Sequence, residues 1–122
     1  MASEGLHEEG GLLDEATVDH HRAVVSLCEE LEAIDWYDQR VRATKDESLA
    51  ALLAHNRDEE KEHASMTLEW LRRRDPELDR MLRTYLFTEG PITDREAGGE
   101  EAEPKGQSPS GSLGIGSLKG RE

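Results

Sequence analysis

Residues 48–74 read SLAALLAHNRDEEKEHASMTLEWLRRR, and their apolar positions establish the kind of fold the chain can form. Leucine, tryptophan and histidine recur at intervals of three and four residues, which is the spacing of one helix face. At the centre, the hexapeptide DEEKEH (58–63) sets Glu60 three residues before His63. Both side chains leave the same side of a helix about one turn apart. We therefore predict a helix over roughly 48–74 that carries a carboxylate and an imidazole in metal-ligand spacing.

The first half of the chain predicts a second long helix that packs against this one. It is expected to run from near Asp14, with Asp14 or Thr17 as its N-cap, to about Thr44. Residues 45–48, KDES, form a short polar break. Two long helices joined by so short a connection are expected to be antiparallel neighbours.

A third and shorter helix is expected to follow. Asp75 and Pro76 suit the N-cap and the first position of a helix, which continues as PELDRMLRTYLF over residues 76–87 and ends before Gly90. The sequence contains no alternating strand pattern. We therefore predict an all-α fold of two long antiparallel helices and one short helix.

The length of the chain limits the number of domains, and its composition and charge restrict the partners that it can bind. The 122 residues allow at most one domain, and 34% hydrophobic against 35% charged residues leave a small core, which favours oligomerisation. The net charge of −13 disfavours nucleic acid and anionic membranes as partners and favours cations. A single cysteine, Cys28, excludes an internal disulfide and fits a reducing cytoplasm. We expect neither a secretory signal at the N-terminus nor a membrane span.

The chain is expected to divide into four segments. Residues 1–13 form a flexible lead and residues 14–90 a helical domain. Residues 91–111 are rich in Gly, Ser, Pro and Glu and are expected to be a disordered linker, and residues 112–122 follow it. Since the last 32 residues contain six acidic and four basic side chains, the first 90 carry −11 of the net charge. The acidity therefore belongs to the helical domain.

Glu30 is the third candidate metal ligand. At 100° per residue it lies in the middle of the apolar stripe of the first long helix, and Glu60 shares an apolar stripe with His63 on the second. A carboxylate on a core-facing stripe must be paired, protonated or bound to metal, because burial of an isolated charge is costly. The alternative is a solvated acidic face, which runs such as DEEKEH usually form. The shared register of the three residues with the leucines favours the metal site.

A second stripe of acidic residues follows a different face of each helix. Its members have 4-3-4 spacing and are Val25, Glu29, Glu32 and Trp36 on the first helix, and His55, Glu59, Glu62 and Met66 on the second. Two such faces per helix indicate two different protein contacts, which close into a ring if the rotation allows. Ordinary exposed glutamates are the alternative for this stripe.

One chain supplies half of a di-metal ligand set. A two-fold axis beside Glu30, Glu60 and His63 would give four helices, two single glutamates and two Glu-x-x-His pairs, which are the ligands of di-metal centres in four-helix bundles. Imidazole and carboxylates suit Fe(II), Mn(II) or Zn(II), and the residues do not decide among them. Tyr37 lies one or two turns from Glu30 on the same stripe and is expected to line the site.

The sequence resembles the encapsulated ferritins over most of residues 17–92. Three segments carry the resemblance: CEELEAIDWYDQR (28–40), AHNRDEEKEHASMTLEWLRR (54–73) and LRTYLFTEGPIT (82–93). The resemblance implies a ferritin-like four-helix bundle completed by dimerisation, and dimers that assemble into an annular homodecamer. It also implies ferroxidase activity, the oxidation of Fe(II) to Fe(III) by O₂ at a di-iron centre.

The resemblance assigns residues to this activity. It implies catalytic and iron-ligand roles for Glu30, Glu60 and His63, with Tyr37 beside them. It also implies secondary metal sites that attract and relay iron, and Ca or Zn are further metals expected there. The residues of these secondary sites are Glu29, Glu32, Trp36, His55, Glu59 and Glu62.

The C-terminal residues 112–120, SLGIGSLKG, resemble the cargo-loading peptide of encapsulin cargo proteins. Leu113, Ile115 and Leu118 are their large apolar side chains and are expected to dock in a hydrophobic groove of the shell protein, with the linker giving reach. This implies a place in the bacterial cytoplasm, inside the lumen of the encapsulin nanocompartment, where the oxidised iron would be stored. The alternative function is non-enzymatic, that of an acidic helical metal-binding or adaptor cargo protein.

Overall fold

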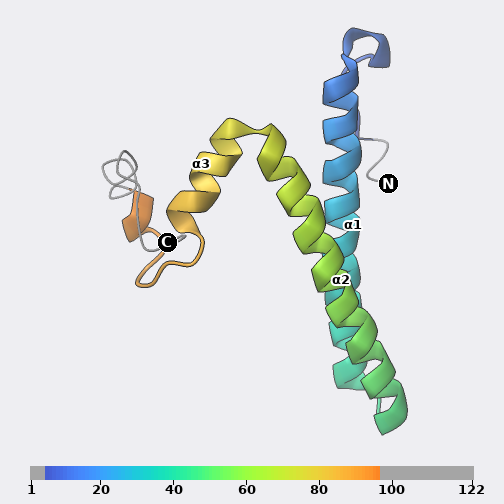
Figure 1. Ribbon diagram of the computed structural model, residues 1–122. Helices are drawn as coiled ribbons and strands as arrows, with labels where there is room; N and C mark the ends of the chain where they lie inside the picture. The colour runs from blue at the N-terminus through green and yellow to red at the C-terminus, as the bar shows by residue number, and fades with distance from the viewer. Residues whose placement is uncertain (1–4, 97–122) are drawn as a thin grey trace. The chain divides into compact units, whose positions relative to one another are not determined.

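The computed structural model describes residues 5–96, which form helices and turns and contain no strand. A short 3-10 helix, η2 (Gly10–Leu12), precedes two long helices, α1 (Glu15–Ala43) and α2 (Glu47–Arg74), and a short helix, α3 (Pro76–Tyr85), follows them (Figure 1). The prediction of an all-α fold with two long helices and one short helix is confirmed. Within this described range, no helix is both long enough and apolar enough to cross a membrane.

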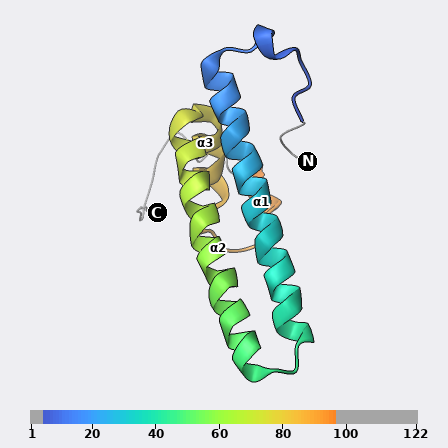
Figure 2. The same ribbon diagram turned by 90° about the vertical axis from the view of Figure 1, so that its right-hand side faces the viewer.

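The described residues divide into two units, one up to Arg74 and one from Asp75. In the first unit, α1 and α2 lie side by side and antiparallel, as both views show (Figures 1 and 2). We call this pair of helices the hairpin. The predicted antiparallel packing of the two long helices is therefore confirmed. The second unit contains α3.

An aspartate caps each long helix at its N-terminus. The carboxylate of Asp14 accepts a hydrogen bond of 2.8 Å from the Thr17 N–H at the start of α1. The carboxylate of Asp46 accepts one of 2.9 Å from the Leu49 N–H at the start of α2. Such caps satisfy backbone donors that have no partner in the first turn of a helix. Asp14 was one of the two predicted caps, and Asp46 lies inside the predicted polar break.

The third helix begins as predicted and ends earlier than predicted. Asp75 accepts a 3.0 Å hydrogen bond from the Leu78 N–H, and Pro76 occupies the first turn. The helix ends at Tyr85 rather than at residue 87, because the next residue is extended and Phe87 has a φ of 61°. A positive φ cannot continue a right-handed helix.

The core of the hairpin is thin. Ala64 and Leu71, both on α2, are the only buried residues among those described. Large apolar side chains remain exposed on both long helices, namely Leu31, Trp36, Leu49, Leu52 and Met66. Two helices alone bury only the stripe along which they touch, so much of the apolar surface of the hairpin stays open.

A partly buried ion pair joins the two long helices. The guanidinium of Arg57 on α2 donates a 2.8 Å hydrogen bond to the carboxylate of Asp38 on α1, which also accepts one of 2.9 Å from Arg42. The hydrogen bonds from Arg42 and then Arg57 hold the pKa of Asp38 below its usual value. Since the carboxylate is ionised more readily in the folded chain, this pair stabilises the fold above the unfolded pKa of about 3.9.

We expect Asp38→Asn to lower the Tm of the full chain at pH 7, because Asn cannot form the ion pairs that tie Arg57 to α1. The stabilising contribution of Asp38 is complete above the unfolded pKa and is lost as the pH falls through the lower folded pKa. The difference in Tm between wild type and variant should therefore vanish in strong acid. The control is Asp35→Asn, whose side chain on α1 accepts one hydrogen bond from Gln39. An equal loss of Tm in both variants would contradict the assignment.

Candidate metal centre

Glu30 lies on α1 with one carboxylate oxygen buried and unpaired. Its Oε1 atom is shielded from solvent and has no hydrogen-bond partner among the described residues. The carboxylate lines a groove of about 540 Å³ on the hairpin, whose lining residues are Asp19, Arg22, Ala23, Ser26, Glu30, Met66, Thr67 and Trp70. A buried carboxylate oxygen without a donor is unfavourable, so this position is suited to a cation.

Glu60 and His63 form a pair on α2. The His63 Nδ1 atom lies 3.5 Å from the Glu60 Oε1 atom, one turn along the helix. The Glu60 side chain is 26% exposed and that of His63 is 45% exposed. A carboxylate oxygen and an imidazole nitrogen at this separation are close enough to bind one cation together, and both remain accessible from outside the hairpin.

The groove that Glu30 lines reaches α2 near the Glu60–His63 pair. Thr67, which lines the same groove as Glu30, is one turn beyond His63 and donates a 3.1 Å hydrogen bond from its hydroxyl to the His63 carbonyl oxygen. The groove that contains Glu30 thus begins about one turn of α2 from His63. The register of Glu30, Glu60 and His63 as one ligand set stays a prediction.

The three predicted ligands do not form a complete site within one chain. In residues 5–96, no group of three or more His, Cys, Asp and Glu side chains is placed to hold a metal ion. The structure supplies a glutamate on α1 and a Glu–His pair on α2, which is the partial set described from the sequence. The roles of Glu30, Glu60 and His63 as ligands remain predictions.

The secondary-site residues lie mainly on exposed surface. His55 and Glu59 form a second pair on α2, with 3.6 Å between the His55 Nε2 and Glu59 Oε2 atoms. Glu29 and Glu32 on α1 and Glu62 on α2 are exposed, and Trp36 on α1 is 52% exposed. Each helix thus presents part of the predicted group to solvent. Their role in metal binding remains a prediction.

Tyr37 is half-buried on α1, and Arg40 lies over it. The guanidinium carbon of Arg40 is 5.6 Å from the centroid of the Tyr37 ring, within the range of a cation–π contact. The i, i+3 spacing of these residues could have indicated the contact from the sequence.

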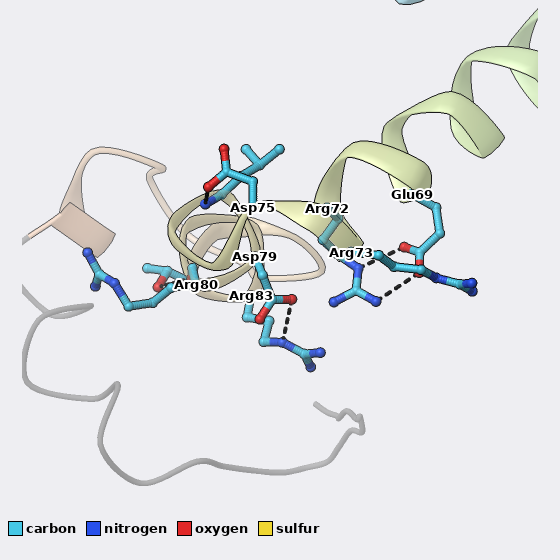
Figure 3. Close-up of polar contacts among 9 residues, drawn as sticks. Glu69, Arg72, Arg73, Asp75, Asp79, Arg80 and Arg83 are labelled. Carbon is cyan, nitrogen blue, oxygen red and sulfur yellow. Dashed lines mark hydrogen bonds and ion pairs between the residues drawn. The ribbon is translucent and has the colours of Figure 1, made fainter. Parts of the chain in front are cut away.

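Glu69, on α2 of the same hairpin, is a carboxylate whose two oxygens both accept hydrogen bonds. Arg72 donates two hydrogen bonds, of 2.7 and 2.8 Å, to its two oxygens, and Arg73 donates one of 2.7 Å (Figure 3). The bonds from Arg72 first and Arg73 second lower the pKa of Glu69 to about 2. This glutamate is engaged by arginines of its own helix, whereas the buried oxygen of Glu30 has no such donor.

Asp19 is a groove residue that the sequence reasoning did not select. It lines the groove with Glu30 and forms a 2.7 Å ion pair with Arg22. Asp19 precedes Glu30 by eleven residues, which is three helical turns, so the two share one face. This spacing in the sequence could have indicated that Asp19 shares a helix face with Glu30.

A helical hairpin with an unpaired glutamate on one helix and a Glu-x-x-His pair on the other presents half the ligand set of a carboxylate-bridged four-helix metalloprotein. A family model described as EncFtn-like matches residues 5–89. The chain belongs to the EncFtn-like family, and the resemblance seen in the sequence is confirmed.

Relatives are similar along most of the chain. A protein of Rhodospirillum rubrum named encapsulated ferritin-like protein is 60% identical over 128 aligned residues, covering 98% of this chain and 91% of the relative. A ferritin-like protein of Thermotoga maritima is 52% identical over 109 residues, covering 89% of this chain and 93% of the relative. The crystal structure of a Nitrosomonas europaea protein matches with a TM-score of 0.70 and 60% identity, covering 72% of this chain and 97% of that one.

We expect Glu30→Gln to raise the stability of the metal-free chain by about 1 kcal/mol, because an amide costs less to bury than an unpaired carboxylate. Thermal unfolding in the presence of a chelator measures this change. The matched control is Glu69→Gln, which breaks the arginine bonds of a paired carboxylate and should lower the Tm. A destabilised Glu30→Gln variant would show that this carboxylate is satisfied in the absence of metal.

Proposed function

We propose that the chain is a ferroxidase that acts as a homodimer on Fe(II) as its substrate, with O₂ as the oxidant. The observation that carries the proposal is the buried, unpaired Oε1 atom of Glu30, in a groove one turn of α2 from His63 and its partner Glu60. Anionic oxygen and neutral imidazole are the donors that Fe(II) accepts in proteins of this ligand type. Membership of the EncFtn-like family supports the assignment.

The proposal requires a second copy of the chain. One hairpin offers three ligands, and two hairpins related by a two-fold axis offer six, in the ratio of four carboxylates to two imidazoles. The exposed apolar side chains of the hairpin, such as Leu31, Leu49 and Leu52, give the second hairpin a surface to cover. The resulting four-helix bundle would seclude the site from bulk water. Further association of dimers into an annular decamer belongs to the same proposal.

The residues of the chain have distinct roles in this scheme. Glu30 and Glu60 provide the negative charge that offsets two divalent ions, and His63 provides a neutral nitrogen donor. Two Fe(II) ions bound there as substrate would supply one electron each, so that O₂ with two protons from water would become H₂O₂ and both ions would become Fe(III). Tyr37, one or two turns from Glu30 on α1 and in contact with Arg40, is proposed to line the site.

The acidic surface is proposed to bring iron to the centre. The first 90 residues carry a net charge of −11, which raises the local concentration of cations. The exposed His55–Glu59 pair on α2, with 3.6 Å between the Nε2 and Oε2 atoms, is proposed to bind iron transiently. Iron would pass there, and to Glu29, Glu32, Trp36 and Glu62, before it reaches the buried carboxylate; Ca or Zn are further candidates for these sites.

We further propose that the protein is cargo of an encapsulin nanocompartment in the bacterial cytoplasm, which stores the iron. The name of the Rhodospirillum rubrum relative, encapsulated ferritin-like protein, supports this. In this organisation residues 1–13 lead into a helical domain of residues 14–90, residues 91–111 are a linker and residues 112–122 load the cargo. The shell-binding side chains Leu113, Ile115 and Leu118 lie outside the described residues.

We expect Glu30→Ala, Glu60→Gln and His63→Ala each to reduce the initial rate of O₂ uptake with Fe(II) by roughly ten-fold or more, because each removes a metal ligand. An oxygen electrode measures the rate, and ferric absorbance follows the product. The controls are Glu47→Gln in the exposed first turn of α2 and His20→Ala on the exposed surface of α1. These variants should retain the wild-type rate.

The same assay separates the proposed enzyme from its alternative. A non-enzymatic metal-binding or adaptor protein would bind Zn(II) but consume no O₂ when Fe(II) is added. Wild-type rates in all three ligand variants would overturn the ferroxidase assignment.

We expect deletion of residues 112–122 to abolish co-purification with a co-expressed encapsulin shell protein and to leave the rate of iron oxidation unchanged. The reason is that the apolar side chains proposed to bind the shell lie in this segment, apart from the metal ligands. Affinity purification of the shell followed by a stain for the cargo measures the loss. A matched full-length variant with Ser110→Ala should still co-purify, and retention of the truncated chain would refute the role of the segment.

A further inference from the structure

Trp70 is an oxidisable side chain in the groove that Glu30 lines. Its indole contributes to the groove from α2 and is half-buried. His63 precedes Trp70 by seven residues, so the two lie about 20° apart around α2 and about 10 Å apart along its axis. They therefore share one face of the helix. An indole in this position lies within reach of the oxidants that form where Fe(II) reacts with O₂.

Arg74, the last residue of α2, lies over this indole. The guanidinium carbon of Arg74 is 3.8 Å from the centroid of the Trp70 ring, and its Nη1 atom donates a 3.5 Å hydrogen bond to the Trp70 carbonyl oxygen. The two preceding arginines, Arg72 and Arg73, donate instead to the carboxylate of Glu69. Although the chain has 28 acidic residues, the contacts of Arg74 among the described residues are both with a tryptophan.

A cation over the ring makes the indole harder to oxidise. Removal of an electron leaves a positive charge on the ring, and the guanidinium at 3.8 Å repels that charge. In the neutral ring, the same guanidinium is attracted to the π electrons. Both effects favour the reduced indole over the oxidised one. The position of Arg74 therefore lowers the tendency of Trp70 to lose an electron.

We propose that Arg74 is a positioning residue of the proposed ferroxidase, whose charge keeps Trp70 from giving electrons to O₂ chemistry in the groove. The inference rests on the proposed function and adds to it a determinant of which group is oxidised. With Arg74 in place, Fe(II) remains the electron donor. Without it, the H₂O₂ formed from O₂ oxidises the indole by two electrons. The ring then gains one oxygen atom, and the other oxygen leaves as water.

Trp36 provides a comparison within the same chain. The chain has two tryptophans, and Trp36 on α1 is 52% exposed. It is not among the residues that line the groove of Glu30. Within residues 5–96, the cation–π contacts are those of Tyr37 and Trp70. Oxidation of Trp36 should therefore not depend on Arg74.

Peptide mass spectrometry of the full chain after repeated additions of Fe(II) in air tests the proposal. We expect the neutral variants Arg74→Gln and Arg74→Met to raise the oxidised fraction of Trp70 per O₂ consumed by roughly ten-fold, the scale of a lost cation–π contact. Oxidation of Trp36 should stay at the wild-type level. Arg74→Lys keeps the charge and should protect Trp70. The matched control is Arg73→Gln, which removes the same charge from the neighbouring arginine that bonds to Glu69.

Each outcome decides the matter. Equal oxidation of Trp70 in the wild type and in the neutral variants would overturn the proposal. Oxidation in Arg74→Lys as high as in Arg74→Gln would show that the charge is not what protects the ring, and would also overturn it. So would a rise at Trp36 as large as that at Trp70, which indicates general damage. An oxygen electrode in the same sample separates the two proposals, because a wild type without O₂ uptake contradicts the ferroxidase itself.

Discussion

The buried oxygen of Glu30 is a group that the described residues leave without a hydrogen-bond partner. Burial removes water from this atom, and the described residues provide no donor in its place. Glu69, on the neighbouring helix, has three bonds from two arginines and a pKa near 2. The hairpin is therefore able to neutralise a carboxylate with its own side chains and does not do so at Glu30. A bound cation would offset the unpaired negative charge of Glu30. The candidate site therefore centres on this residue.

The thin core of the hairpin leads to the same requirement at the level of packing. Only Ala64 and Leu71 are buried among residues 5–96, so two long helices expose apolar side chains that a single chain does not cover. A second hairpin would bury that surface and also double the ligands. Association of two hairpins would therefore both cover the apolar surface and complete the ligand set. A substitution that weakens either contribution is expected to weaken the other.

The helices and their antiparallel pairing were predictable from the sequence, and the particular side-chain contacts between the two helices were not. The Asp14 and Asp75 caps follow from residue types at the helix starts, and the positions of Glu30 on α1 and Glu60 on α2 follow from helical spacing. The ion pair between Asp38 and Arg57 spans 19 residues and depends on how two helices align, so spacing along one helix does not reveal it. The burial of one oxygen atom of Glu30 depends on the same alignment.

The turn at Phe87 escaped prediction for a different reason. TYLFTEG contains no glycine at the position that needs a positive φ, and Leu86 and Phe87 continue the apolar pattern of α3, so the sequence predicted more helix there. A chain of net charge −13 repels its own copies until cations offset the repulsion or apolar contacts overcome it. If cations bind better to assembled chains, assembly must by linkage raise the affinity for cations by the same factor. Metal loading at Glu30 and association of the hairpins through their exposed apolar side chains would then reinforce one another.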